Sequence, residues 1–168
     1  AVIDPITGYA EMLNYRRDAQ PALTAQARED ATPRARGVLG NLDQIAVVRE
    51  IQQLTKPGEY VYVGLNRHDK IFANDVMLYF LLDRNSPTRY HELHPGLVNT
   101  EVVQQEMIAD LEKHKPRYVV TTDMFKLVIE PNDTAKSTKV TMLDQYLTKN
   151  YRFSNFIGSY VIYTRRDP

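Results

Sequence analysis

The chain has 168 residues and no cysteine, and its formal net charge is zero because 21 Lys and Arg residues balance 21 Asp and Glu residues. The lack of cysteine excludes disulfide bonds, thiolate metal sites and cysteine nucleophiles. The zero net charge gives no general attraction to nucleic acid or to an anionic membrane, so a strongly basic binding protein is not expected, and the length suits one globular domain.

The start of the chain and its apolar segments bear on its location. The sequence begins at Ala1 without a methionine and shows no basic-then-apolar secretory signal. The longest apolar run covers residues 76–82 and is far shorter than the roughly 20 residues that a membrane-spanning helix needs. We therefore expect a soluble chain that is a processed form or an excerpt of a longer protein.

Residues 1–37 differ in composition from the rest of the chain. They contain Pro5, Pro21 and Pro33, are rich in Ala, Gln and Arg, and show only weak helical spacing. We predict a partly helical leader over 1–37 and a single α/β domain over 38–168. Balanced basic and acidic residues make an exposed arm the simplest interpretation of the leader, and a docking arm for a partner is the alternative.

The first part of the predicted domain alternates helix and strand. Apolar residues at helical spacing predict a helix over about 42–54 that ends at Lys56-Pro57-Gly58. β-Branched and aromatic residues then predict a short buried strand over 59–64. Asn74-Asp75 can cap a further helix over 76–82, whose apolar residues on every side predict burial almost all round.

The alternation continues more loosely along the chain. Residues 88–93 predict a second strand, and Thr100 can cap a helix that closes before Pro116. Residues 117–122 predict a third strand.

The C-terminal part predicts a different arrangement. A polar connecting stretch over 130–139 leads to a short helix around 142–146. Two strands over 151–156 and 160–164 then flank Gly158-Ser159, which predicts a hairpin turn. Helices between strands indicate right-handed βαβ crossovers, so we predict an α/β fold, a three-layer Rossmann-like sandwich with a mainly parallel sheet and a C-terminal antiparallel hairpin.

Polar residues gather where the predicted strands end. In open α/β sheets, ligands bind outside the carboxyl ends of the strands, so these positions are the candidate binding residues. Three of the four histidines fall among them. The candidates are Asn66, Arg67, His68, Asp69, Asn74, Asp75, Arg89, His91, Glu92, His94 and Asp123.

These residues suggest two kinds of chemistry. A zinc site could use the three histidines, but on a strand His91 and His94 would point to opposite faces, so we expect no metal. His68 beside Asp69, and His91 beside Glu92, could serve as general acid/base pairs. Adjacent residues on a strand face opposite ways, however, so ordinary loop ion pairs are the simpler interpretation.

Several nucleotide and hydrolase motifs are absent from the sequence. It has no Gly-x-Gly-x-x-Gly fingerprint, no phosphate-binding P-loop and no Gly-x-Ser-x-Gly elbow, so we expect neither a nucleotide cofactor nor serine hydrolase activity. Asp75 and Glu101 lie at the predicted helix starts that could otherwise attract anions. This favours a neutral polar ligand such as a sugar.

A set of short motifs extends over residues 34–163. They are Arg36-Gly37-Val38, Thr55-Lys56-Pro57-Gly58-Glu59, Tyr62-Val63-Gly64, Arg67-His68-Asp69, Asn74-Asp75, Tyr79-Phe80, Arg84, Thr88-Arg89-Tyr90-His91-Glu92, His94-Pro95-Gly96, Gln104 and Asp110-Leu111-Glu112. Together they resemble the soluble C-terminal region of bacterial polytopic membrane proteins. Those proteins are related to the dolichyl-phosphate-mannose protein mannosyltransferases and the lipid-A aminoarabinose transferases.

The resemblance implies a specific role. In such enzymes a membrane body holds the lipid-linked sugar donor and the catalytic carboxylate, and neither is in this sequence. The chain would be an extracytoplasmic domain on a bacterial membrane, with residues 1–37 as the membrane-proximal connection. Its partners would be the membrane-embedded part of the parent protein and a glycan or acceptor, and it would not be catalytic alone.

Two other hypotheses stay open. The chain could be a stand-alone small α/β enzyme that uses His68, Asp69, His91 and Glu92. It could also be an interaction module without a small ligand. We expect no cofactor and no nucleic-acid partner in any of the three cases.

Overall fold

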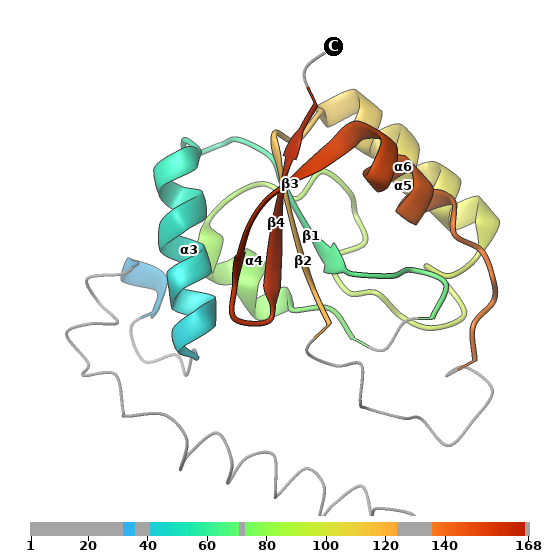
Figure 1. Ribbon diagram of the computed structural model, residues 1–168, viewed down its shortest axis with the longest axis horizontal. Helices are drawn as coiled ribbons and strands as arrows, with labels where there is room; N and C mark the ends of the chain where they lie inside the picture. The colour runs from blue at the N-terminus through green and yellow to red at the C-terminus, as the bar shows by residue number, and fades with distance from the viewer. Residues whose placement is uncertain (1–31, 36–40, 71–72, 124–135, 167–168) are drawn as a thin grey trace, which may run out of the picture.

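A four-stranded mixed sheet forms the centre of the fold (Figure 1). The computed structural model describes residues 32–35, 41–70, 73–123 and 136–166. The strands are β1 (Val61–Leu65), β2 (Tyr118–Thr122), β3 (Tyr151–Ile157) and β4 (Tyr160–Arg165), in the spatial order β1-β2-β4-β3. β1 and β2 run parallel, whereas β4 is antiparallel to both of its neighbours.

This sheet confirms the α/β class and the C-terminal hairpin but not the predicted strand directions. The expectation of a mainly parallel sheet is wrong, because β1 with β2 is the parallel pair among the described strands. Residues 88–93, predicted as a strand, form bends. Their buried side chains are those of Thr88, Tyr90 and Leu93, which do not follow the alternation of a strand. The Rossmann-like three-layer arrangement stays a prediction.

Helices cover both faces of the sheet (Figure 1). α3 (Leu42–Leu54) and α4 (Val76–Leu82) pack on one face, and α5 (Glu101–His114) and α6 (Met142–Asn150) pack on the other. The bounds agree with the predicted helices, except that α6 extends beyond residue 146. None of the helices in the described ranges is long and apolar enough to cross a membrane.

Each face of the sheet has its own hydrophobic core, and every residue of β1 and β2 is buried. The core beneath α3 and α4 contains Ala35, Val47, Val48, Ile51, Val61, Val63, Leu78, Leu81, Leu82, Tyr118, Val120, Tyr160 and Ile162. The core beneath α5 and α6 contains Tyr62, Leu65, Tyr90, Leu93, Val98, Val103, Met107, Leu111, Val119, Leu143 and Tyr151. Residues 88–93 therefore contribute apolar side chains to the second core without adding a strand.

α4 is amphipathic, so the prediction that it is buried almost all round is wrong. Leu78 and Leu82 are fully buried beneath it, whereas Val76, Met77 and Phe80 are 45%, 39% and 47% exposed. A short helix at the end of a sheet meets the core on one side only, and its other apolar residues stay at the surface.

Part of the predicted leader belongs to the core. The described residues 32–35 include the short helix η1 (Pro33–Ala35), and Ala35 is 2% exposed against α4. Arg34 Nη2 lies 2.5 Å from Asp83 Oδ1 at the end of α4. The remaining leader positions, 1–31 and 36–37, lie outside the described residues.

Backbone and side-chain groups of residues 74–85 close the outer edge of β1, where no named strand pairs with it in the described part of the chain. The Val61 amide donates to the Asn85 carbonyl at 2.9 Å, and the Val63 amide donates to the Tyr79 hydroxyl at 2.8 Å. Asn74 Nδ2 donates to the Val63 carbonyl at 2.9 Å. Residues 74–85, which precede the segment predicted as a strand, therefore satisfy this edge by individual contacts.

Asp75 links three elements through one buried carboxylate. It caps α4 by accepting from the Leu78 amide at 3.1 Å, and it accepts from Gln44 Nε2 of α3 at 3.0 and 2.9 Å. The Tyr160 hydroxyl of β4 donates to it at 2.5 Å. Asp75 is 6% exposed, so this sequence candidate has a structural role.

Replacing Asp75 tests that role. We expect Asp75→Ala to lower the free energy of unfolding by about 2–4 kcal/mol, because it removes a helix cap and the buried carboxylate to which Gln44 and Tyr160 donate. Urea unfolding measures the loss. Asp110→Ala on α5, which takes no part in these contacts, is the control, and an equal change in both variants would contradict the assignment.

Candidate functional site

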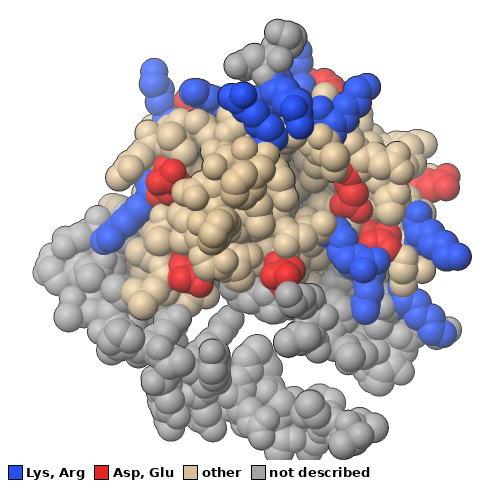
Figure 2. Space-filling model, in the orientation of Figure 1, with Lys and Arg blue, Asp and Glu red and all other residues tan. Residues whose placement is uncertain are grey.

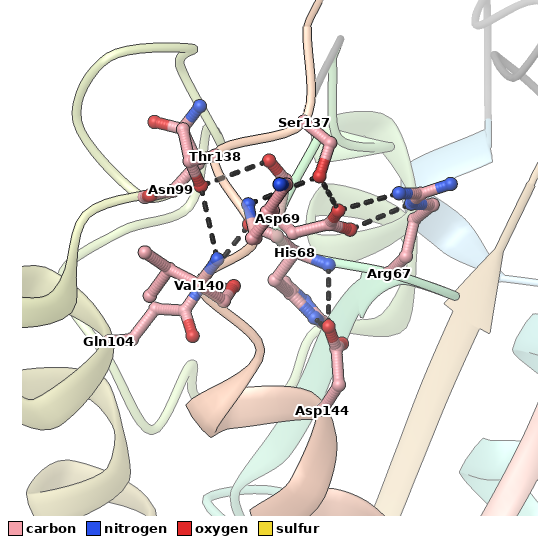
Figure 3. Close-up of polar contacts among 10 residues, drawn as sticks. Arg67, His68, Asp69, Asn99, Gln104, Ser137, Thr138, Val140 and Asp144 are labelled. Atoms are coloured by element: carbon pink, nitrogen blue, oxygen red, sulfur yellow. Dashed lines mark hydrogen bonds and ion pairs between the residues drawn. The ribbon is translucent and has the colours of Figure 1, made fainter.

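The turn after β1 carries four of the predicted site residues and is tied to distant parts of the chain (Figure 3). Arg67, His68 and Asp69 form its centre, and partners of this group come from α5, α6 and residues 136–140. Just before them, exposed Asn66 accepts a short hydrogen bond from the Thr121 hydroxyl at the end of β2. Asp123, half-buried, follows β2 at the same edge of the sheet.

His68 is held in the interior between two side chains. Its Nδ1–H donates to Asp144 Oδ1 at 2.7 Å, and Nε2 lies 2.9 Å from the Tyr62 hydroxyl, which donates to it when the ring is neutral. His68 and Tyr62 are both 0% exposed, and burial raises the pKa of Tyr62 well above its usual value. Neither ring nitrogen of His68 is open to a substrate.

Gly64 makes room for this arrangement. A Cβ at this position would lie 2.6 Å from Cε1 of the Tyr62 ring, which packs over it. Because the ring is fully buried, it has no free space into which to move. The glycine near the end of β1 is therefore required by the aromatic ring two residues before it.

Asp69 forms a second polar centre in the same turn. Arg67 donates to both of its carboxylate oxygens, at 2.7 and 2.6 Å, and the Ser137 hydroxyl makes a short hydrogen bond to it. These hydrogen bonds, that of Arg67 foremost, lower the pKa of Asp69 from 3.8 to about 2. Asp69 is thus an ionised and fully engaged carboxylate.

The backbone of this turn, like its side chains, is held by hydrogen bonds from distant residues (Figure 3). Gln104 Nε2 of α5 donates to the carbonyls of His68 and Val140, both at 3.0 Å, and Gln104 Oε1 accepts from the Leu143 amide at 3.0 Å. The Thr138 amide donates to the Asp69 carbonyl at 2.9 Å. The turn therefore locks α5, α6 and residues 136–140 together.

The observed pairs differ from those predicted for acid/base chemistry. His68 pairs with Asp144, far along the chain, and not with Asp69. Glu92 Oε2 lies 3.1 Å from Nε2 of His94. Among the described residues, no group of three His, Asp or Glu side chains could hold a metal ion.

The other candidates lie apart from this turn. Asn74 is 5% exposed beside β1 and donates to the carbonyls of Val63 and His91, both at 2.9 Å, while its Oδ1 has no hydrogen-bond partner. Arg89 pairs with Glu106 of α5 at 2.8 Å. The strand-end residues thus divide into separate groups with separate partners.

An open groove of about 660 Å³ lies beside the outer edge of β1. It is lined by Tyr60, Val76, Tyr79, Phe80, Arg84, Asn85, Ser86 and His91. Of these, only His91 is a predicted site residue. The motifs of the sequence resemblance nevertheless include four lining residues, Tyr79, Phe80, Arg84 and His91. These motifs were the sequence signal from which the groove could have been predicted.

The groove combines aromatic surface with hydrogen-bonding groups. The rings of Tyr79 and His91 lie 5.6 Å apart, and burial raises the pKa of Tyr79 to about 12, so its hydroxyl stays neutral. Arg84 is held by Thr55, whose hydroxyl and carbonyl accept from it at 2.9 and 3.0 Å. The described lining contains no carboxylate, so it offers no negative charge that would select a cationic ligand.

Comparisons with known proteins do not assign this chain to a family. No protein-family model matches it, and no curated protein matches it. A solved structure of the C-terminal globular domain of an oligosaccharyltransferase from Archaeoglobus fulgidus aligns with 77% of this chain and 100% of its own, at 13% identity and a TM-score of 0.38. A TM-score this low does not establish a common fold, so membership of a membrane glycosyltransferase family stays a prediction.

The pKa of Asp69 predicts how stability depends on acid. Since its folded-state pKa of about 2 lies below the ordinary 3.8, the ionised group stabilises the fold above about pH 4 and loses this contribution as the pH falls toward 2. We expect Asp69→Asn to be less stable at neutral pH and to lose less on acidification through this interval. Urea unfolding of both chains at a series of pH values measures the difference. Asp110→Asn is the control, and parallel acid profiles for Asp69→Asn and the unaltered chain would refute the assignment.

Proposed function

We propose that this chain is an extracytoplasmic accessory domain of a bacterial membrane-bound glycosyltransferase-like protein, and that it binds a glycan or acceptor without being catalytic alone. The groove beside β1 is the observation that carries the proposal. The sequence resemblance supports the same role and supplies the proposed partner, the membrane-embedded part of the parent protein.

The chemistry of the groove fits a carbohydrate. Sugar rings present apolar C–H faces that pack on aromatic and aliphatic surface, and Phe80 and Val76 offer such surface at 47% and 45% exposure. The hydroxyl groups of a sugar need donors and acceptors around that surface, which Asn85, Ser86 and His91 can supply. The volume of about 660 Å³ is in the range of small-ligand sites.

The polar turn after β1 supports a role without catalysis. His68 is 0% exposed with both ring nitrogens engaged, and the Asp69 carboxylate is occupied by Arg67 and Ser137. His91 is exposed at the groove, but Glu92 pairs with His94 instead. Within the described residues, the His68–Asp69 acid and base pair that the stand-alone enzyme hypothesis names is therefore not formed.

Glycan binding and two groove variants test the proposal. We expect the 168-residue chain to bind members of an array of neutral hexose oligosaccharides. The oligosaccharide that the array retains best is then titrated by calorimetry. We expect Phe80→Ala and His91→Ala each to weaken its binding about tenfold, because each variant removes one good contact. Val102→Ala on α5, whose side chain is 75% exposed outside the groove, is the control and should leave affinity unchanged.

Two results would contradict the proposal. If the unaltered chain retains no oligosaccharide, or if Val102→Ala weakens binding as much as Phe80→Ala, the groove is not a glycan site. If the purified chain by itself transfers or hydrolyses a sugar, it is an enzyme in its own right.

A further inference from the structure

Basic side chains gather at the end of the molecule where β2 and β3 begin and β4 ends. We call this group the basic end. The Arg165 amide donates to the Arg117 carbonyl at 2.9 Å, and the Arg166 amide donates to the Asn150 carbonyl at 2.8 Å, so these segments meet there. The basic end consists of Lys113, Lys115, Arg117, Lys149, Arg152, Arg165 and Arg166.

The charge of the basic end faces solvent. All of its members are exposed except Arg165, which is half-buried and lies 3.4 Å from the carboxylate of Glu112. Figure 2 shows Lys and Arg atoms gathered beside the C-terminus, above a region with few charged atoms. Lysines at the ends of α5 and α6 also complement the helix dipoles, but Arg117, Arg152 and Arg166 lie outside these helices.

Two exposed aromatic rings adjoin the basic end on the edge strand β3. Phe153 and Phe156 are 59% and 68% exposed, and their ring centroids lie 6.5 Å apart. Residues three apart on a regular strand face opposite sides, but the register of β3 shifts between Phe153 and Asn155. Because of this bulge, both rings lie on the α6 side of the sheet.

The cross-strand pairs confirm this placement. Phe153 pairs with Tyr163 and Phe156 pairs with Val161, whereas the neighbouring pair of Ile157 and Tyr160 belongs to the core on the α3 side. Tyr163 and Val161 are themselves half-buried. The result is an apolar patch on β3 and β4 that the described helices leave uncovered. It lies on the same face of the sheet as Arg165, which pairs with Tyr151 two residues before Phe153.

We propose that the basic end and the Phe153–Phe156 patch together dock on the surface of an anionic lipid bilayer. Lys and Arg side chains near such a surface are attracted by its negative potential, and exposed aromatic rings enter the boundary between headgroups and acyl chains. The two features adjoin on one corner of the molecule, so both can act in a single orientation. The inference does not depend on what the groove binds.

The composition of the patch favours a bilayer over other anionic partners. Besides the two Phe rings it includes aliphatic Val161, and aliphatic surface is stabilised by entering a lipid boundary, whereas it does not stack on a base. A bilayer instead uses both the positive charge and the apolar rings. Nucleic-acid binding and pairing of two copies through β3 become outcomes of the test.

Vesicle binding by charge variants is the first test. The 168-residue chain is centrifuged with vesicles of phosphatidylcholine alone or of phosphatidylcholine with phosphatidylglycerol, at low and high salt. We expect binding to the anionic vesicles that weakens with salt, and a loss of at least about tenfold in the double variant Lys149→Glu with Arg152→Glu. Lys139→Glu, on the segment that contacts Asp69 at the other end of the sheet, is the matched control and should retain affinity.

Fluorescence locates the contact, because the chain contains no tryptophan. In the variant Phe153→Trp, we expect the emission to shift to the blue when anionic vesicles are added, and brominated lipids to quench it. Val102→Trp on α5, a position that is 75% exposed, is the control and should show neither change. Thermal unfolding of each variant shows that it folds.

Several results would overturn the proposal. They are failure of the unaltered chain to bind anionic vesicles, equal binding by Lys149→Glu with Arg152→Glu, and an emission shift in Val102→Trp as large as that in Phe153→Trp. Binding to a single-stranded DNA oligomer but not to vesicles would assign the surface to nucleic acid instead. Self-association that is lost in Phe153→Ala with Phe156→Ala, without vesicle binding, would make it an interface between copies.

Discussion

The unpaired outer edge of β1 is the constraint on which much of this structure depends. Backbone donors and acceptors on a buried strand must be satisfied, and no strand of the described chain pairs with this edge. Asn85, Tyr79 and Asn74 satisfy it instead. To do so, residues 74–85 have to remain close to β1 along its length, which fixes the position of α4.

The groove follows from this arrangement. A regular strand at the edge would have presented a continuous surface, whereas individual contacts from a helix and an irregular segment leave a hollow between them. Tyr79 and Asn85, which satisfy the edge, also line the groove, together with Phe80 on the outer side of α4. Some of the residues that satisfy the edge of β1 are therefore also residues that could bind a ligand.

The sequence predicted local features well and distant pairings poorly. The cap at Asp75, the start of α5 after Thr100 and the turn at Gly158, with a φ of 55°, depend on neighbouring residues and were predicted correctly. The Thr100 hydroxyl, however, donates to the Leu97 carbonyl at 2.7 Å and does not cap α5 as predicted. The pairing of His68 with Asp144 joins segments far apart in the chain, and no local pattern reports it. The prediction of a strand over residues 88–93 was wrong because Tyr90 and Leu93 are both buried beneath α5. Their spacing of three residues does not match the alternation of a strand, and strand propensity takes no account of that spacing.

The distribution of charge over the surface likewise could not be predicted from composition. A net charge of zero suggested no attraction to anionic surfaces, yet it describes only the sum over the chain. The topology brings the starts of β2 and β3, the end of β4 and the C-terminal ends of α5 and α6 to one end of the sheet, and each of these segments carries Lys or Arg there. One bulge in β3 then places Phe153 and Phe156 on a single face beside that charge. A polarised, partly apolar surface can thus arise in a neutral chain from the order of its strands alone.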